Sequence, residues 1–200
     1  MPDNYIIRSQ RQMRALAAAT RQEIVDVLPR MGTVSVAELA GALGRPADSL
    51  YYHLRILKRV GLVLSAGSRR LNGRLESLFR AVAPEMSLCY EFGKKGNARE
   101  VNAIIASMLR LGVRDFSNSF RTADASVSGP KRELWALRKT GWLSQEQIAE
   151  VNRHLHALMR IMAVSGKNGR LYAVTVVLTP LARRSRRRAG RDYDRVVTWV

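Results

Sequence analysis

The sequence predicts a mostly α-helical protein with a small β-sheet component. Apolar residues recur every three or four positions over several stretches, as in helices with one buried face. At three expected helix starts, a Ser or Thr precedes a Glu or Gln by three positions, the spacing of a capping box. Short runs rich in β-branched and aromatic residues, bounded by Gly or Pro, predict strands in both halves.

The first predicted helical region covers residues 9–30. Thr20 precedes Glu23 at capping-box spacing, which predicts that a new helix begins at Arg21. The apolar positions that fall near one face are Met13, Leu16, Ala17, Ile24, Val27 and Leu28.

Two shorter helices are expected next. Ser35 and Glu38 form a second capping box, and Gly44 ends the helix that follows. Pro46 stands at or near the first position of a third helix, which ends at Gly61. Its expected buried stripe consists of Leu50, Leu54 and Leu57.

A hairpin follows, with apolar-bearing segments at residues 62–64 and 74–82 around a glycine-containing, basic tip. We expect the tip to be longer than a two-residue turn. Three short helices followed by a basic hairpin make a winged helix-turn-helix, which we place at residues 9–83.

Two motifs also resemble a known family. Leu16-Ala-Ala-Ala-Thr20-Arg21, with Ile24 and Leu28, resembles the opening helix of arsenical-repressor (ArsR) type regulators. The run SLYYHLRIL from Ser49 to Leu57, followed by Val60-Gly-Leu-Val63, resembles their recognition helix and its exit into the wing. The resemblance covers roughly residues 10–83. It implies a DNA-binding transcription regulator, and the resembling families mostly repress.

The third helix has the geometry of a recognition helix. If its leucine stripe faces the core, the opposite face presents hydrogen-bonding and cationic side chains, and a helix of this kind fits the major groove. The candidate DNA-binding residues are Ser49, Tyr51, Tyr52, Arg55, Lys58 and Arg59 on the helix, and Arg69, Arg70 and Arg74 on the hairpin.

These candidates have different expected roles. Arg55 suits a guanine edge or a phosphate, whereas Lys58 and Arg59 suit the phosphate backbone. The hairpin arginines suit phosphates or the minor groove. One of the two tyrosines could instead pack against the first helix, and His53 beside the leucine stripe suits a structural role.

Residues 84–182 are expected to form a helical dimerisation and possible effector region with a short sheet. The pattern predicts a short strand within 86–92, a helix over 98–120 that Asn97 caps, and a short helix over 133–137. Ser144 and Gln147 form the third capping box, at the start of a helix to about Met162. A strand is expected over 171–178.

The helix from Ser144 has an apolar seam at near-heptad spacing, which fits either a dimer interface or packing within one chain. We favour a homodimer built from residues 98–120 and 144–163, because paired half-sites raise the specificity of DNA binding. The candidate dimerisation residues are Ile148, Val151, Leu155, Leu158 and Met162.

Net charge indicates polyanionic partners. The chain has 34 Lys and Arg against 16 Asp and Glu, a formal net charge of +18, which attracts nucleic acid or an anionic membrane surface. Double-stranded DNA is the expected partner, with a sequence-blind architectural or RNA-binding protein as the alternative. No apolar run is long enough to span a bilayer and no signal peptide is visible, so we expect a soluble cytoplasmic protein without a membrane partner.

The sequence predicts no enzyme, no metal and no cofactor. The catalytic motifs of common enzyme families are missing, and three histidines leave little acid–base chemistry near neutral pH. Cys89 is the single cysteine, and His154 and His156 point about 200° apart on a helix. Glu150 and His154 share a face, but two ligands are too few for a structural zinc site.

Two features leave several interpretations open. The aromatic residues Phe116, Phe120, Trp135 and Trp142 suit either a core or a pocket for an unknown small-molecule effector. The tail at residues 183–200 begins with the arginine run 183–188, which suits a solvated tail, a partly disordered arm or an extra phosphate contact.

Overall fold

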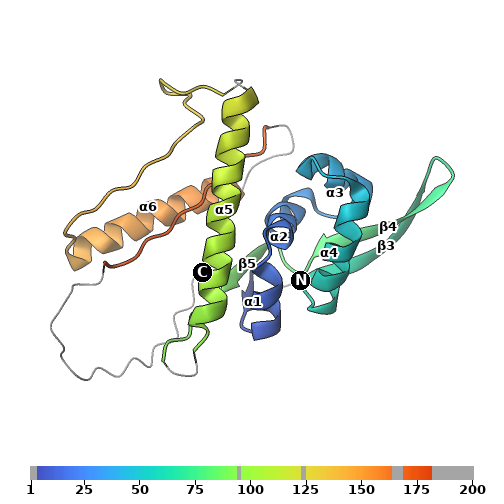
Figure 1. Cartoon of the computed structure of the whole chain (residues 1–200), viewed down its shortest axis with the longest axis horizontal. Helices are drawn as coiled ribbons and strands as arrows, with labels where there is room; N and C mark the ends of the chain where they lie inside the picture. Colours follow the sequence, from blue (N-terminus) through green and yellow to red (C-terminus); the bar gives the residue numbers. More distant parts are fainter. Residues whose placement is uncertain (1–3, 94–95, 123–124, 164–168, 182–200) are drawn as a thin grey trace. The chain divides into compact units, whose positions relative to one another are not determined.

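The computed structural model describes residues 4–93, 96–122, 125–163 and 169–181, so the tail predicted at 183–200 lies outside the described residues. Its elements are drawn in Figure 1, which labels all the helices and the strands β3, β4 and β5. In chain order they are β1 (Asn4–Ile7), α1 (Gln10–Leu16), α2 (Ala19–Met31), β2 (Val34–Ser35), α3 (Val36–Leu43), α4 (Ala47–Arg59), β3 (Val63–Leu71), β4 (Arg74–Ala81), β5 (Glu85–Leu88), α5 (Ala98–Thr122) and α6 (Gln145–Ala163). The mostly helical fold with a small sheet component is confirmed.

The described chain divides into two compact units. The first contains residues 4–112 and 174–181, and the second contains residues 113–173. Helix α5 therefore begins in the first unit and ends in the second. The helices and hairpin of the winged helix-turn-helix all lie in the first unit.

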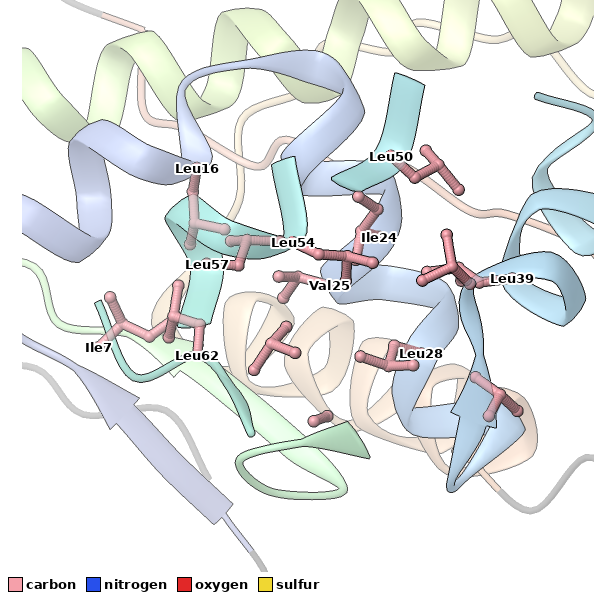
Figure 2. Close-up of a cluster of buried hydrophobic side chains, with 14 of the residues drawn as sticks. Ile7, Leu16, Ile24, Val25, Leu28, Leu39, Leu50, Leu54, Leu57 and Leu62 are labelled. Atoms are coloured by element: carbon pink, nitrogen blue, oxygen red, sulfur yellow. The ribbon is translucent and has the colours of Figure 1, made fainter. Parts of the chain in front are cut away.

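A single hydrophobic core holds the first unit together. Leu50, Leu54 and Leu57 of α4 are at most 1% exposed and lie among apolar side chains of α2 (Figure 2). The core also includes Ile7 of β1 and Ile104 of α5. It therefore extends on both sides of the range 9–83 expected for this domain.

The hairpin turn differs from its prediction. β3 and β4 pair antiparallel up to Leu71 and Arg74, so the turn has only the two residues Asn72 and Gly73. Both residues have positive φ, 50° and 78°, which is what the tight primed hairpin turns require and what Asn-Gly favours. The expected longer tip was wrong because the residues before Asn72 extend β3 instead.

Two strand pairings were not predicted. β2 pairs antiparallel with β4 through Val34 and Ser35, so the small sheet has the order β2-β4-β3. β1 pairs in parallel with β5, from Asn4 opposite Glu85 to Ile7 opposite Leu88. The strand expected within 86–92 is therefore confirmed in part, since it starts at Glu85 and stops at Leu88.

Helix starts were predicted with mixed success. The Ser35 capping box is present, because Ser35 Oγ accepts from the Glu38 amide and Glu38 Oε2 accepts from the Ser35 amide. The box expected at Thr20 was wrong: α2 begins at Ala19, after Ala18 in extended conformation, and no side chain caps it. Asn97 precedes α5 as expected, but its side chain does not cap the helix. Its amide nitrogen donates to the Cys89 carbonyl and its oxygen accepts from the Glu91 amide, both in the preceding loop.

Helix α6 of the second unit begins as predicted. The Ser144 amide donates to Gln147 Oε1 at 2.9 Å, and the Gln147 amide donates to Ser144 Oγ at 3.3 Å. The capping box thus satisfies backbone donors that the first turn leaves without intrahelical partners.

Two elements expected in the second half do not form. Residues 133–137 are not helical, because the Glu133 amide donates to the Ser126 carbonyl and Arg132 bonds the Leu134 carbonyl. A five-residue helix gains too little to replace such contacts. Residues 171–178 pair with no strand among the described residues, so their β propensity has no ladder to join.

Candidate nucleic-acid interface

Helix α4 presents one face to the core and the other to solvent. Its first turn carries Asp48 and its last turn carries Lys58 and Arg59, charges that complement the helix dipole. Because the leucine stripe is buried, the opposite side is the part of α4 that another molecule can reach. The predicted site residues Tyr51, Tyr52, Arg55, Lys58 and Arg59 are all exposed there.

The two tyrosines extend into solvent. Tyr51 is 55% exposed and Tyr52 is 56% exposed, so the interpretation that one of them packs against the first helix was wrong. Arg55 lies over the Tyr52 ring, with its guanidinium carbon 6.0 Å from the ring centroid. At this distance a weak cation–π attraction favours an extended arginine above the helix surface.

A shallow recess lies between α4 and β4. The residues that line it are Tyr51, Tyr52, Leu54, Arg55, Lys58 and Phe79. Its phenyl, phenol and aliphatic walls are apolar, and Arg55 and Lys58 bring two cations to it. Such a surface can contact both the apolar groups and the acceptor atoms of base edges.

Ser49 is placed differently from the other candidates on α4. Its hydroxyl donates to the Pro46 carbonyl at 2.7 Å, in the first turn of the helix. The hydroxyl proton is therefore used locally, while the oxygen remains exposed as an acceptor.

The hairpin carries two exposed arginines, Arg70 and Arg74, on either side of the Asn72-Gly73 turn. Figure 1 shows the hairpin projecting as a two-stranded ribbon beyond α3 and α4. Two cations near the tip of a projecting ribbon can reach a polyanion that contacts α4.

Arg69 does not share this exposed position. Its guanidinium lies 2.9 Å from Glu38 Oε1 of α3 and 3.2 Å from Glu76 Oε2 of β4. The two carboxylates raise the pKa of Arg69, and the Ser35 amide, followed by the Arg69 guanidinium, lowers the pKa of Glu38. The structure thus separates Arg69 from the other two hairpin candidates.

His53 sits on the side of α4 between its exposed and buried faces. Its Nδ1 is buried without a hydrogen-bond partner among the described residues, and its ring meets that of Tyr52 edge to face. Burial lowers the pKa of His53, and the positive charges of Arg21 and Arg45 lower it further. Both effects disfavour the charged form of His53, which agrees with the structural role expected for it.

The predicted dimerisation residues form one stripe on α6. Ile148, Val151, Leu155, Leu158 and Met162 are all half-buried, whereas Ile161 on another side of the helix is 72% exposed. The structure thus brings the five together on one face, and none of them is fully buried.

The four aromatic residues considered for an effector pocket do not gather. Phe116 and Phe120 lie on successive turns of α5 with ring centroids 5.5 Å apart. Trp135 is 62% exposed beneath the Arg132 guanidinium, and Trp142 is 87% exposed. The core interpretation was therefore wrong for both tryptophans. The short helix expected to carry Trp135 does not form.

Sequence reasoning missed two residues that build this site. Gln12 of α1 is buried and donates to the Val60 carbonyl at the end of α4. Arg11 lines the same hollow as Arg59, together with Ser9, Gln12 and Val60. Gln12 adjoins Met13, which the amphipathic pattern places on the apolar face. No spacing rule predicts a hydrogen bond from α1 to a carbonyl 48 residues away.

Comparison with known families identifies the class of this region. Residues 16–66 match the family model of a helix-turn-helix domain, from the last residue of α1 through α4 into β3. The chain therefore contains a helix-turn-helix domain, a domain type of DNA-binding transcription regulators, and the observed hairpin makes it a winged one. No match to a curated protein was found.

Within the described ranges, no helix has the length and apolar character needed to cross a membrane. Across the same residues, no three His, Cys, Asp or Glu side chains cluster as metal ligands would.

Proposed function

We propose that this protein is a sequence-specific transcription regulator that binds duplex DNA through α4 and the β3–β4 hairpin. The observation that carries the proposal is the exposed face of α4. Arg55 and two tyrosines that are more than half exposed stand beside Lys58 and Arg59, while the leucines of the same helix anchor it in the core. A rigid helix with this distribution suits the major groove.

We further infer that the regulator is of the ArsR type and acts as a homodimer on a palindromic operator. The apolar stripe on α6, none of which is fully buried within the single chain, supports self-association, and two copies would read two half-sites. Repression is the favoured outcome, since occupation of a promoter needs only DNA binding. The proposal requires no catalysis, metal or cofactor.

A charge-driven architectural role is the second candidate, and the net charge of +18 favours it. Such a protein would bind duplexes of any sequence, with an affinity that falls steeply as salt rises. The two candidates therefore differ in base discrimination rather than in binding as such.

Selection from random duplexes with the purified chain tests both. A regulator should enrich a two-fold symmetric sequence and bind it at least about a thousandfold more tightly than unrelated duplex at physiological salt. Arg55→Ala should reduce discrimination at one base position by about 1–3 kcal/mol. Arg110→Ala, at an exposed position of α5, removes the same charge and should leave discrimination unchanged.

The alternative outcomes are distinct. Equal affinity for all duplexes, with a steep salt dependence, would establish the architectural role. A chain that binds no duplex even at low salt would contradict both candidates.

A further inference from the structure

The side chain of Arg69 connects three elements of the winged domain. It projects from β3, contacts Glu76 directly opposite on β4, and reaches Glu38 in the first turn of α3. The Nε and one terminal nitrogen both lie within 3.3 Å of the same Glu76 oxygen. One guanidinium is thus shared between two carboxylates from different elements.

Glu38 has a second role at the same point. Its other oxygen, Oε2, accepts the Ser35 amide at 2.8 Å and completes the capping box of α3. Ser35 also pairs with Leu78 of β4. The start of α3 is therefore tied to the hairpin twice, by the backbone of β2 and by the side chain of Arg69.

Arg70, the next residue, provides the contrast. Side chains alternate along a strand, so Arg70 points away from the side that faces α3. It is exposed, and no ion pair of Arg70 occurs among the described residues. Adjacent arginines of the same strand thus have opposite electrostatic surroundings.

We infer that Arg69 is a positioning residue that fixes the hairpin against α3, and that the phosphate contact made by this strand belongs to Arg70. The second half of the inference rests on the proposed DNA-binding function. The first half concerns the protein alone. Two contacts along its length hold the hairpin so that its tip stays at a fixed distance from α4. A two-stranded ribbon without such contacts would not keep that distance.

Hydrogen exchange on the full-length chain tests the positioning role without DNA. Arg69→Gln should speed exchange of the β3 and β4 amides near residues 68–77 by about threefold to tenfold, the range expected for two partly exposed ion pairs. Glu38→Gln should act in the same direction, because Gln keeps the capping box but loses the charge. The double variant should add little to the Arg69→Gln change, because Arg69→Gln already removes the Arg69–Glu38 pair. Arg70→Gln is the matched control and should leave the exchange rates unchanged.

Salt-dependent binding to the selected operator tests the assignment of the phosphate contact. Arg70→Gln should reduce the slope of log K against log salt by about one, as loss of one phosphate contact does. Arg69→Gln should weaken binding by a similar factor at every salt concentration and leave the slope unchanged.

Three results would overturn the inference. Unchanged exchange in Arg69→Gln would remove the positioning role. Fully additive effects of Arg69→Gln and Glu38→Gln would show that the two residues do not act through one contact. A reduced salt slope for Arg69→Gln, with a normal slope for Arg70→Gln, would return the phosphate contact to Arg69. If the wild-type chain binds no duplex, the proposed function fails, while the exchange result still decides the positioning role.

Discussion

The Gln12 side chain holds the end of α4. Its Nε2 donates to the Val60 carbonyl at 2.9 Å and to the Tyr5 hydroxyl at 2.8 Å. Val60 is the C-terminal cap of the proposed recognition helix, where carbonyls lack intrahelical donors. A residue of α1 therefore binds the end of the recognition helix, just before Gly61 leads into β3.

The first prediction concerns this bond. Gln12→Ala should lower the free energy of unfolding by about 1–3 kcal/mol, because the partly buried Val60 carbonyl loses its donor. Urea unfolding followed by circular dichroism measures the change. Gln10→Ala removes an exposed amide from the same helix and should cost less than about 0.5 kcal/mol. Equal losses for the two variants would contradict a specific role of Gln12.

The second prediction concerns the hairpin turn. Asn72 has a φ of 50°, a conformation that a β-branched residue adopts only with strain. Asn72→Val should therefore destabilise the turn by about 1–2 kcal/mol, whereas Asn72→Gly should be close to neutral. Amide exchange of the residues next to the turn reports both changes. If the Val variant exchanges as slowly as wild type, the two-residue turn is wrong.

The third prediction concerns pH. The pKa of His53 is lowered in the folded protein, relative to an unfolded value of 6.5. At pH values between these two pKa values, the unfolded chain binds more protons than the folded protein. Stability should therefore fall as pH decreases through and below about 6.5, and should stop falling for this reason below the folded pKa. His53→Gln should reduce the fall measured by unfolding between pH 7.5 and 5.5. His154→Gln, at an exposed position of α6, is the control. Parallel pH profiles for wild type and His53→Gln would exclude this source of pH dependence.

The fourth prediction concerns self-association. Leu155→Glu places a carboxylate in the half-buried stripe of α6, and we expect it to raise the dimer Kd at least about tenfold, because an unpaired buried charge is costly. Ile161→Glu changes a residue that is 72% exposed on another side of the helix and should leave the dimer intact. Sedimentation equilibrium gives both constants. A wild-type monomer, or a Leu155→Glu chain that only loses stability, would favour packing within one chain.

Local sequence signals predicted α3, α4 and the start of α6 well. Ser35 with Glu38 and Ser144 with Gln147 satisfy backbone groups within four residues, so the information needed lies inside each segment. Leu50, Leu54 and Leu57 fall on one face for the same reason, because helical spacing alone groups them. The exposed candidates on the opposite face follow from this stripe.

Long-range contacts set the features that the sequence did not predict. β1 forms because its four residues meet β5, about 80 positions later, and no local pattern marks that pairing. Arg69 was assigned to DNA because basic residues cluster around it, whereas its position is set by Glu38 and Glu76 on other elements. Residues 171–178 were predicted as a strand from β propensity, but they pair with no strand among the described residues.

The parallel pairing of β1 with β5 has a consequence for dissecting the protein. The segment that matches the helix-turn-helix family starts at Leu16 and ends at Ala66, inside β3. A fragment with these bounds would leave out Ile7, Met13 and Ile104, which complete the core beneath α4. The smallest autonomous folding unit is thus larger than the recognition motif, and transplanting the motif alone into another protein would expose the apolar surface that these three side chains cover.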